Sequence, residues 1–470
     1  MDRLEKAKPR EIIDDFAKAI EDRKTAGPKP AMAVIDFRHE RSSGIERPIF
    51  YVPIELLRYR KDNGRISSDV LSYEKDHGIL DERSADTQRT IRAFLKEKDP
   101  DRTDELKRSI SHEGQRDPAI VTCDGFLING NRRKMVMELL IEEPKHRGDP
   151  KLTNMKVVIL PGKNDEGGPP TLLEIEQIEN RYQLQSEGKA EYSNFDRALS
   201  MRRKIDLGMS LEEQLKDDPA YGGLEKKEFK KAVRKLEEEY LNPLECIDRY
   251  LGHLGRPGLY TTIAKSIGDR EGRWQAFLDY YDSIYQRLRD DRKRTLMGVR
   301  EDEAGRIEDI AFKIIRKREL TGLPKVHQVM RDLPKWLGNP DAKKELLAIG
   351  KEVPFELPKE ECYDKEGNEY SEREKDRIWG RKHGNPILRQ LNRAKDCYDR
   401  GKERETPIDL LEAALKKLNH ENMLPESISI DDIPKAMRLA KEIKERADAL
   451  ENDLYHCHKE YKQFRDKHKK

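Results

Sequence analysis

The stretch FLINGNRRKMVMELL, residues 126–140, decides the fold that we expect for this chain. A short apolar run reaches Asn129-Gly130, two arginines follow directly, and an apolar pattern of helical period begins. Glycine lets the backbone turn with positive φ, and the first N–H groups of a helix have no partner inside it. With the forked donors of Arg132 and Arg133, this turn predicts an anion site, most naturally for phosphate. The alternative is a plain strand-to-helix turn with two solvated arginines.

Length and composition argue against a single core. The 470 residues suffice for roughly two to four domains of ~100–200 residues each. Only 35% of the residues are hydrophobic and 40% are charged, against ~25% charged in an ordinary globular protein, so we expect helices with wide solvated faces. The 94 basic and 92 acidic residues leave a net charge of +2. Any affinity for nucleic acid must therefore come from local basic patches.

The cysteines and the hydropathy of the sequence indicate the cellular compartment. The five cysteines are scattered without a Cys-x-x-Cys pair, which indicates neither a zinc cage nor a disulfide framework and fits a reducing compartment. No apolar run approaches the ~18–20 residues of a membrane-spanning helix, and the N-terminus has no apolar signal core. We expect a cytoplasmic protein without membrane contact.

Short strands and helices alternate around the opening stretch. A helix over 103–114, capped by Thr103 and ended by Gly114, precedes a hairpin whose arms, 119–123 and 126–129, flank Asp124-Gly125. A strand-like apolar run at 47–57 and a strand at 156–160 complete the pattern. This alternation predicts an α/β domain over residues 47–187, preceded by a loosely attached arm, residues 1–46.

The order of these elements resembles the N-terminal domain of ParB-type chromosome and plasmid partition proteins, within the ParB/sulfiredoxin-like superfamily. The resemblance runs from ELKRSISHEGQRDPAIVTCDGFLINGNRRKMVMELL through MKVVILPG to LLEIEQIENRYQLQ and covers about residues 48–185. It implies a small domain that binds a nucleoside triphosphate, CTP or ATP, with Mg²⁺.

The resemblance also implies a set of site residues by their positions in this sequence. The triphosphate would be held by Gly130, Asn131, Arg132 and Arg133. Beside the phosphates and metal would lie Glu179, as a partner of Mg²⁺ or of a water molecule, and Asn180, with Arg65 and Gln115 as flanking contacts.

Two departures from the family pattern matter. Asn131 stands where an acidic residue is usual, so binding is better supported than hydrolysis, and a weak NTPase activity of the CTPase kind stays open. Residues 66–100 form an insertion that could change base selectivity or cover the pocket.

Beyond residue 190 the pattern predicts helices only, which we divide into 188–260 with a candidate helix-turn-helix, a helical domain over 261–385, and 386–470. The helix at 225–239 turns a basic face away from its apolar residues. That face carries Lys226, Lys227, Lys230, Lys231, Arg234 and Lys235. It could contact DNA phosphates in the major groove, and a solvated helix face is the alternative.

The last part of the chain carries an apolar stripe. From about Asp432 to Phe464, apolar residues recur at alternating steps of four and three, which predicts a long amphipathic helix and a coiled coil. We expect a homodimer through this helix. The alternative is an intramolecular hairpin with the helices between Ile387 and Leu418.

These patterns predict an α+β protein, a small ParB/sulfiredoxin-like α/β domain followed by a mostly α-helical region. The function expected is a nucleotide-binding, DNA-associated switch in partition, DNA transactions or phage defence, with other proteins of the same system as further partners. The alternatives are a nuclease or small-molecule kinase on the same fold, although no distinct catalytic cluster favours a nuclease, and a helical interaction scaffold with a vestigial nucleotide site.

Overall fold

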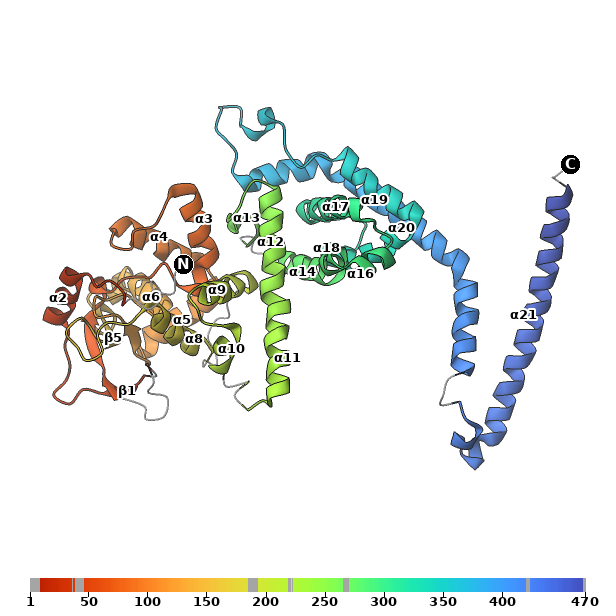
Figure 1. The fold of residues 1–470 in the computed structure, drawn as a ribbon. Coiled ribbons are helices and arrows are strands. Elements are labelled where there is room, and N and C mark those ends of the chain that lie inside the picture. Colours follow the sequence, from red (N-terminus) through yellow and green to blue (C-terminus); the bar gives the residue numbers. More distant parts are fainter. Residues whose placement is uncertain are drawn as a thin grey trace. The chain divides into compact units, whose positions relative to one another are not determined.

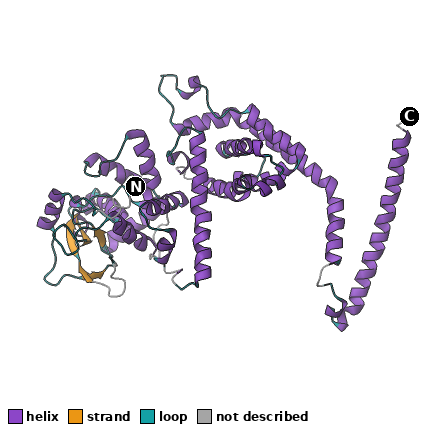
Figure 2. Cartoon of the chain, in the orientation of Figure 1, coloured by secondary structure: helices purple, strands orange, loops and turns teal. Residues whose placement is uncertain are grey.

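The computed structural model describes residues 9–35, 37–38, 46–184, 193–218, 221, 223–264, 270–419 and 423–467. Its contacts divide the chain into two units, Met1–Asp396 and Cys397–Lys470. Helices dominate, and the strands gather in one part of the first unit (Figure 2). The expected combination of α and β structure with a largely helical remainder is therefore confirmed. None of the described helices combines the length and the apolar character needed to cross a membrane.

Two small sheets form the β structure of the first unit. β3 (Phe50–Pro53), β5 (Asn154–Ile159) and β4 (Ala119–Val121) make a three-stranded sheet in that order. β3 runs antiparallel to β5, and β4 runs parallel to it. β1 (Met32–Val34) and β2 (Glu46–Pro48) pair antiparallel in the second sheet.

The predicted hairpin turns at Asp124-Gly125, where Gly125 has a φ of +84°. The Thr122 N–H donates to the Phe126 carbonyl and closes the turn at 3.0 Å. The second arm, 126–129, makes only isolated bridges, in which Leu127 pairs with Val121 and Phe126 with Arg58. The strand that we predicted at 126–129 is therefore not formed, because the chain leaves the sheet to enter the next helix.

Both faces of the three-stranded sheet are covered, as successive strand residues point to opposite sides. On one face, Val121 and Val157 belong to a large apolar core with helices of the same unit. These helices are α3 (Ser67–His77), α4 (Ala85–Glu97), α5 (Pro100–Glu113) and α6 (Asn131–Ile141). On the other face, Ile120 and Val158 pack with α8 (Leu172–Leu184) and with Ile35 and Phe37.

The segment that we expected to be a loosely attached arm packs tightly on the sheet. Its helix α2 (Asp14–Arg23) buries Ile20, whose side chain approaches Gly125 at the hairpin turn. Arg10 forms an ion pair with the fully buried Asp124 at 2.8 Å. The prediction was wrong because the apolar residues of the arm have a tertiary partner that sequence periodicity does not reveal.

The insertion at 66–100 forms α3 and α4. Val70, Ile91 and Leu95 are buried in the same core as the sheet, so these helices build the domain. The following helix α5 begins at Pro100, three residues before the cap that we predicted at Thr103, because proline suits the first helical turn. It ends as expected at Gly114, which has a φ of +73°.

The rest of the first unit is helical, with one isolated bridge between Tyr363 and Glu369 as its β feature among the described residues. Its helices are α9 (Asn194–Asp206), α10 (Leu211–Lys216), α11 (Lys226–Leu236), α12 (Asn242–His253), α13 (Thr261–Ala264), α14 (Arg270–Tyr280), α15 (Gln286–Arg289), α16 (Asp291–Leu296), α17 (Ala304–Lys317), α18 (Val326–Gly338), α19 (Pro340–Glu352) and the first part of α20 (Glu372–Leu418). A capping box of Ser210 and Glu213 opens α10.

A π-helical segment, Glu237–Leu241, joins α11 to α12 without a break, so that the two form one long helix. This long helix stands between the α/β part and the bundle formed by the later helices, from α14 onward (Figure 1). Trp274 and Phe277 of α14 are buried. The first part of α20 closes the bundle with the buried Trp379 and Ile387.

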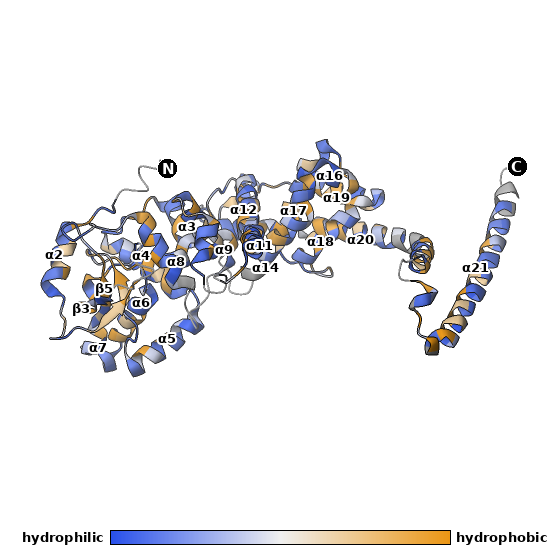
Figure 3. Cartoon of the chain, turned by 60° about the horizontal axis from the view of Figure 1, so that its bottom comes forward, coloured by the Kyte–Doolittle hydropathy of each residue, from blue (hydrophilic) through white to orange (hydrophobic). Residues whose placement is uncertain are grey.

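The second unit consists of the last part of α20, two short turns, and α21 (Ile433–Lys467). None of its residues for which burial is described is buried. Hydrophobic residues occur at the start of α21 and in the segment before it (Figure 3).

Candidate functional site

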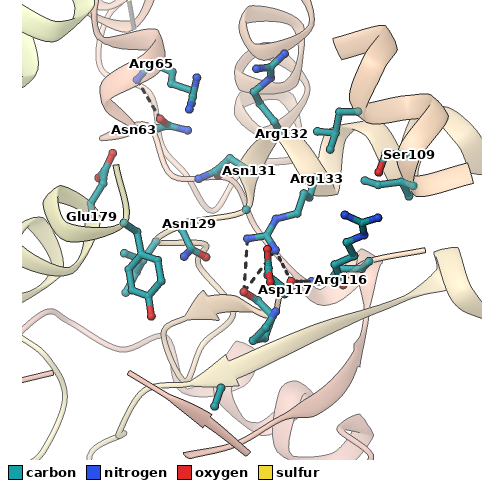
Figure 4. Close-up of a pocket in the computed structure, with 18 of the residues that line it drawn as sticks. Asn63, Arg65, Ser109, Arg116, Asp117, Asn129, Asn131, Arg132, Arg133 and Glu179 are labelled. Atoms are coloured by element: carbon teal, nitrogen blue, oxygen red, sulfur yellow. Dashed lines mark hydrogen bonds between the residues drawn. The ribbon is translucent and has the colours of Figure 1, made fainter. Parts of the chain in front are cut away.

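A cavity of about 590 Å³ opens at the turn that begins α6. Its wall is formed by α5, α6, α8, β1 and the loop around Asn63 (Figure 4). Five arginines line it, namely Arg65, Arg102, Arg116, Arg132 and Arg133. Three acidic residues line it too, namely Glu105, Asp117 and Glu179. The wall therefore carries more positive than negative side chains.

Gly130 fixes the geometry of the turn. Its φ of +84° belongs to the left-handed region, and a Cβ there would lie 2.8 Å from the Ala119 Cβ. The first backbone hydrogen bond of α6 runs from the Lys134 N–H to the Gly130 carbonyl at 2.9 Å. The three preceding N–H groups lie in the first turn, where the helix offers no acceptor. They and the helix dipole favour an anion at this end of α6.

Arg132 reaches from α6 to the start of α5. Its Nη2 donates to the Thr103 hydroxyl at 2.9 Å and approaches the Asp99 carbonyl at 3.3 Å. Its Nε is buried and has no acceptor within the described parts of the chain. Burial, and then the neighbouring Arg65, lower the pKa of Arg132. An anion in the cavity would offset both effects.

Arg133 contacts the two residues that precede the strand β4. Its guanidinium donates to the backbone carbonyls of Asp117 and Pro118, as the dashed lines to Asp117 in Figure 4 show. Burial lowers the pKa of Arg133. Since a guanidinium has five N–H donors, these contacts orient the side chain and leave donors for a ligand.

Asn131 presents a polar atom without a partner. The residue is 5% exposed, and its amide nitrogen lies 3.4 Å from the Leu127 carbonyl. Its Oδ1 is buried and accepts no hydrogen bond from the described residues. A buried acceptor left unpaired costs about 1–3 kcal/mol, so a donor from a ligand or a solvent molecule would stabilise this position.

Glu179 lines the cavity, but both of its oxygens accept hydrogen bonds from the protein. Arg60 donates to Oε2 at 2.8 Å, and the Gly64 N–H donates to Oε1 at 3.1 Å. The carboxylate thereby holds the loop that carries Arg65. Because both oxygens of Glu179 already accept hydrogen bonds from the protein, the carboxylate fits a metal ion poorly. Within the described residues no group of three or more His, Cys, Asp or Glu side chains could hold a metal.

Asn180 does not line this cavity. Its carbonyl accepts from Lys204 of α9 at 3.0 Å, and its amide donates to the Gln214 carbonyl of α10 at 3.0 Å. The resemblance implies that Asn180 lies beside the phosphates, whereas its side chain faces α9 and α10, because one residue step from Glu179 rotates it by about 100° about the axis of α8. Gln115 lines the cavity, yet its amide bridges the carbonyls of Asp117 and Lys156. It therefore holds the start of β4 to β5.

Several wall residues were missed by the sequence analysis. The polar ones include Asn63, Arg102, Glu105, Ser109, Arg116 and Asp117, and the apolar ones include Val34, Ile35, Leu106, Ile128 and the aromatic Tyr182. Arg102 lies in the first turn of α5 and Arg116 follows its last residue, and no local signal in the sequence links either arginine to the turn at Gly130. The contribution of β1 has no local signal either, because it depends on how residues 9–38 pack.

The candidate DNA-contacting residues lie on α11, outside the cavity. Lys226, Lys227, Lys230, Lys231, Arg234 and Lys235 are all exposed. Arg234 pairs with Glu238 at 2.9 Å and Lys235 with Glu239 at 3.6 Å. Phe229, Val233 and Leu236 face the small core shared with α9 and α10. The basic face therefore points to solvent, as the periodicity predicted, but α11 continues into α12 where a helix-turn-helix would end.

Comparisons with protein-family models, curated proteins and solved structures gave no match to this chain. Function is therefore inferred from the residues of the cavity and of α11.

Proposed function

We propose that the chain binds a nucleoside triphosphate, CTP or ATP, in the cavity at the start of α6. The observation that carries this proposal is the meeting of five arginines with the N-terminus of a helix around one cavity. The cavity volume of about 590 Å³ lies in the range of roughly 300–1,000 Å³ usual for small-molecule sites. The same ligand is implied by the resemblance to the ParB-type domain.

The two kinds of wall fit the two ends of a nucleotide. The arginines and the first N–H groups of α6 suit a chain of phosphates. The apolar side chains of Ile35, Leu106 and Ile128 suit a base or sugar, and the unpartnered Oδ1 of Asn131 suits a hydroxyl or amino donor. An inorganic polyphosphate would use only the first of these walls.

The metal has a smaller role in this proposal than the resemblance implies. Mg²⁺ usually accompanies a nucleotide through the phosphate oxygens. Glu179, bonded to Arg60 and Gly64, holds Arg65 in place. We therefore expect binding to persist, at lower affinity, when Mg²⁺ is removed with EDTA.

Calorimetry and thermal denaturation test this proposal with CTP, ATP, GTP, UTP and inorganic tripolyphosphate. At a ligand concentration one hundred times the Kd, the chain should gain about 2.7 kcal/mol of stability. The variant Arg132→Ala/Arg133→Ala should lose this gain, whereas Arg89→Ala, an exposed arginine of α4 outside the cavity, should keep it. Absence of stabilisation by all four triphosphates at millimolar concentration would refute nucleotide binding. Equal affinity for tripolyphosphate would refute recognition of the nucleoside.

We further infer that α11 contacts DNA phosphates, which makes the chain a DNA-associated switch. Lys226, Lys227, Lys230 and Lys231 have no ion-pair partner within the part of the chain that the structure describes. α8 supplies a physical link between the two sites. Glu179 contacts the loop at the cavity, and Asn180 contacts α9 and α10, on which α11 packs.

Fluorescence anisotropy with duplex DNA tests the role of α11. Replacing these four lysines by glutamate should abolish binding, and the binding of the unmodified chain should weaken steeply with salt, because each phosphate contact releases counterions. A control variant, Lys416→Glu/Lys417→Glu, changes exposed lysines of α20 and should bind normally. Unchanged binding by the folded α11 variant would locate the DNA surface elsewhere.

A further inference from the structure

A groove of about 540 Å³ lies on the helical bundle, between α16 and the second half of α18. Its lining includes three basic and three apolar residues, namely Arg287, Lys293, Lys335, Leu296, Met297 and Pro334. We call it the basic groove. None of its described lining residues belongs to the cavity at the start of α6 or to the basic face of α11.

The basic groove has fixed walls, because the corner after α16 packs tightly on the end of α18. Gly298 forms this corner with a φ of +72°, and a Cβ added to it would lie 3.1 Å from the Leu337 carbonyl oxygen. Lys343 of α19 donates to the Gly298 carbonyl at 2.8 Å. Met297 and Pro334 are buried and supply an apolar floor. The groove is therefore built into the fold of the bundle.

Two cations of the basic groove have no acidic partner. Arg287 and Lys293 are exposed, and neither forms an ion pair with any residue that the structure describes. Lys335 pairs with Asp332 at 2.7 Å, yet its side chain remains 59% exposed. Among the described lining residues, Asp282 is the only acidic one. The groove therefore offers an excess of positive charge to a ligand.

The lining favours a peptide over a small molecule or a nucleic acid. A small-molecule site usually encloses roughly 70–90% of its ligand, whereas Arg287, Lys293 and Leu296, which is 79% exposed, lie at the surface. A phosphate backbone would use the cations and leave the apolar floor without a partner. A segment with both carboxylates and apolar side chains has a partner for each.

We propose that the basic groove binds an acidic, leucine-bearing segment of a partner protein. Carboxylates of the segment pair with Arg287 and Lys293, and an apolar side chain packs on Leu296 and on the floor of Met297 and Pro334. Arginine suits this role because its guanidinium binds a carboxylate through two parallel hydrogen bonds. The proposal is independent of nucleotide binding and of the DNA contact of α11.

Fluorescence anisotropy on the full-length chain tests the proposal with a labelled twelve-residue peptide, in which each leucine follows two glutamates. We expect Arg287→Glu/Lys293→Glu to weaken binding of this peptide at least ten-fold. The matched control, Lys344→Glu/Lys351→Glu, makes the same change of net charge at exposed lysines of α19 outside the groove and should bind normally. Leu296→Ser should weaken binding several-fold, because the apolar contact is lost.

Altered peptides and a duplex DNA separate the possible occupants. Replacing the leucines of the peptide by serine, or its glutamates by glutamine, should weaken binding several-fold. Absence of binding by the original peptide at several hundred micromolar would overturn the proposal, as would equal losses in the groove variant and its α19 control. A duplex DNA that loses more affinity than the peptide in Arg287→Glu/Lys293→Glu would make the groove a nucleic-acid surface and overturn the proposal too. Thermal denaturation checks that each variant is folded.

Discussion

Gly130 is the residue on which the candidate site depends most directly. Its positive φ and the 2.8 Å separation between an added Cβ and the Ala119 Cβ impose two separate constraints. We expect Gly130→Ala to lower the free energy of unfolding by about 1–3 kcal/mol more than Gly148→Ala. Gly148 has a similar φ of +79° but nothing within 4 Å of the added carbon, so it isolates the backbone strain. Urea denaturation measures both variants, and equal losses would contradict the steric argument.

Arg102 is a second test at this scale, because only the structure assigns it to the cavity. We expect Arg102→Ala to weaken triphosphate binding by about 10-fold or more, since a charge-assisted hydrogen bond contributes roughly 1.5–3 kcal/mol. Arg108 is an exposed arginine of the same helix that does not line the cavity, so Arg108→Ala should bind normally. Calorimetry compares the two variants. Equal losses would mean that α5 contributes only general positive charge.

At the scale of elements, α8 connects the α/β part to the helices that follow. Glu176 accepts from Arg60 at 2.8 Å, and burial together with Glu179 raises the pKa of Glu176. One turn further along, Asn180 bonds α9 and α10. The helix therefore has one polar side toward the cavity loop and another toward the helical region.

Asn180→Ala should separate these two sides. It leaves the buried Lys204 ammonium without its amide contact, so we expect a loss of about 1–3 kcal/mol in the free energy of unfolding. Triphosphate affinity should change less than three-fold, because Asn180 does not line the cavity. Thermal denaturation and calorimetry on the same variant give both values. Lost affinity with unchanged stability would return Asn180 to the binding site.

At the scale of the whole molecule, the first unit contains the cavity, α11 and the buried part of α20. A chain ended at residue 400 keeps Leu391 and Ala394, which complete its core. We expect this shortened chain to fold, to be monomeric, and to retain stabilisation by a triphosphate. Light scattering and thermal denaturation check the three expectations. A dimeric shortened chain would show that the first unit also associates.

The sequence alone determined the features that depend on neighbouring residues. Gly130 and the arginines after it, the Asp124-Gly125 turn, the capping box at Ser210 and the stripe of α21 follow from local conformational preference and helical period. Each of these needs only a few consecutive residues or a constant step along one helix. For that reason the element types were largely predictable, while the ends, such as the start of α5 at Pro100, were less so.

Only the tertiary structure decided which distant residues share the cavity. Residues 9–38 supply β1 to its wall, Arg102 and Arg116 approach from the two ends of α5, and Asn180 turns away. These outcomes depend on apolar burial between segments far apart in the chain, such as Ile20 against the hairpin turn. The order of the residues does not reveal which distant segments pack together, because the hydrophobic effect depends on the apolar area removed from water and not on the separation of two residues along the chain.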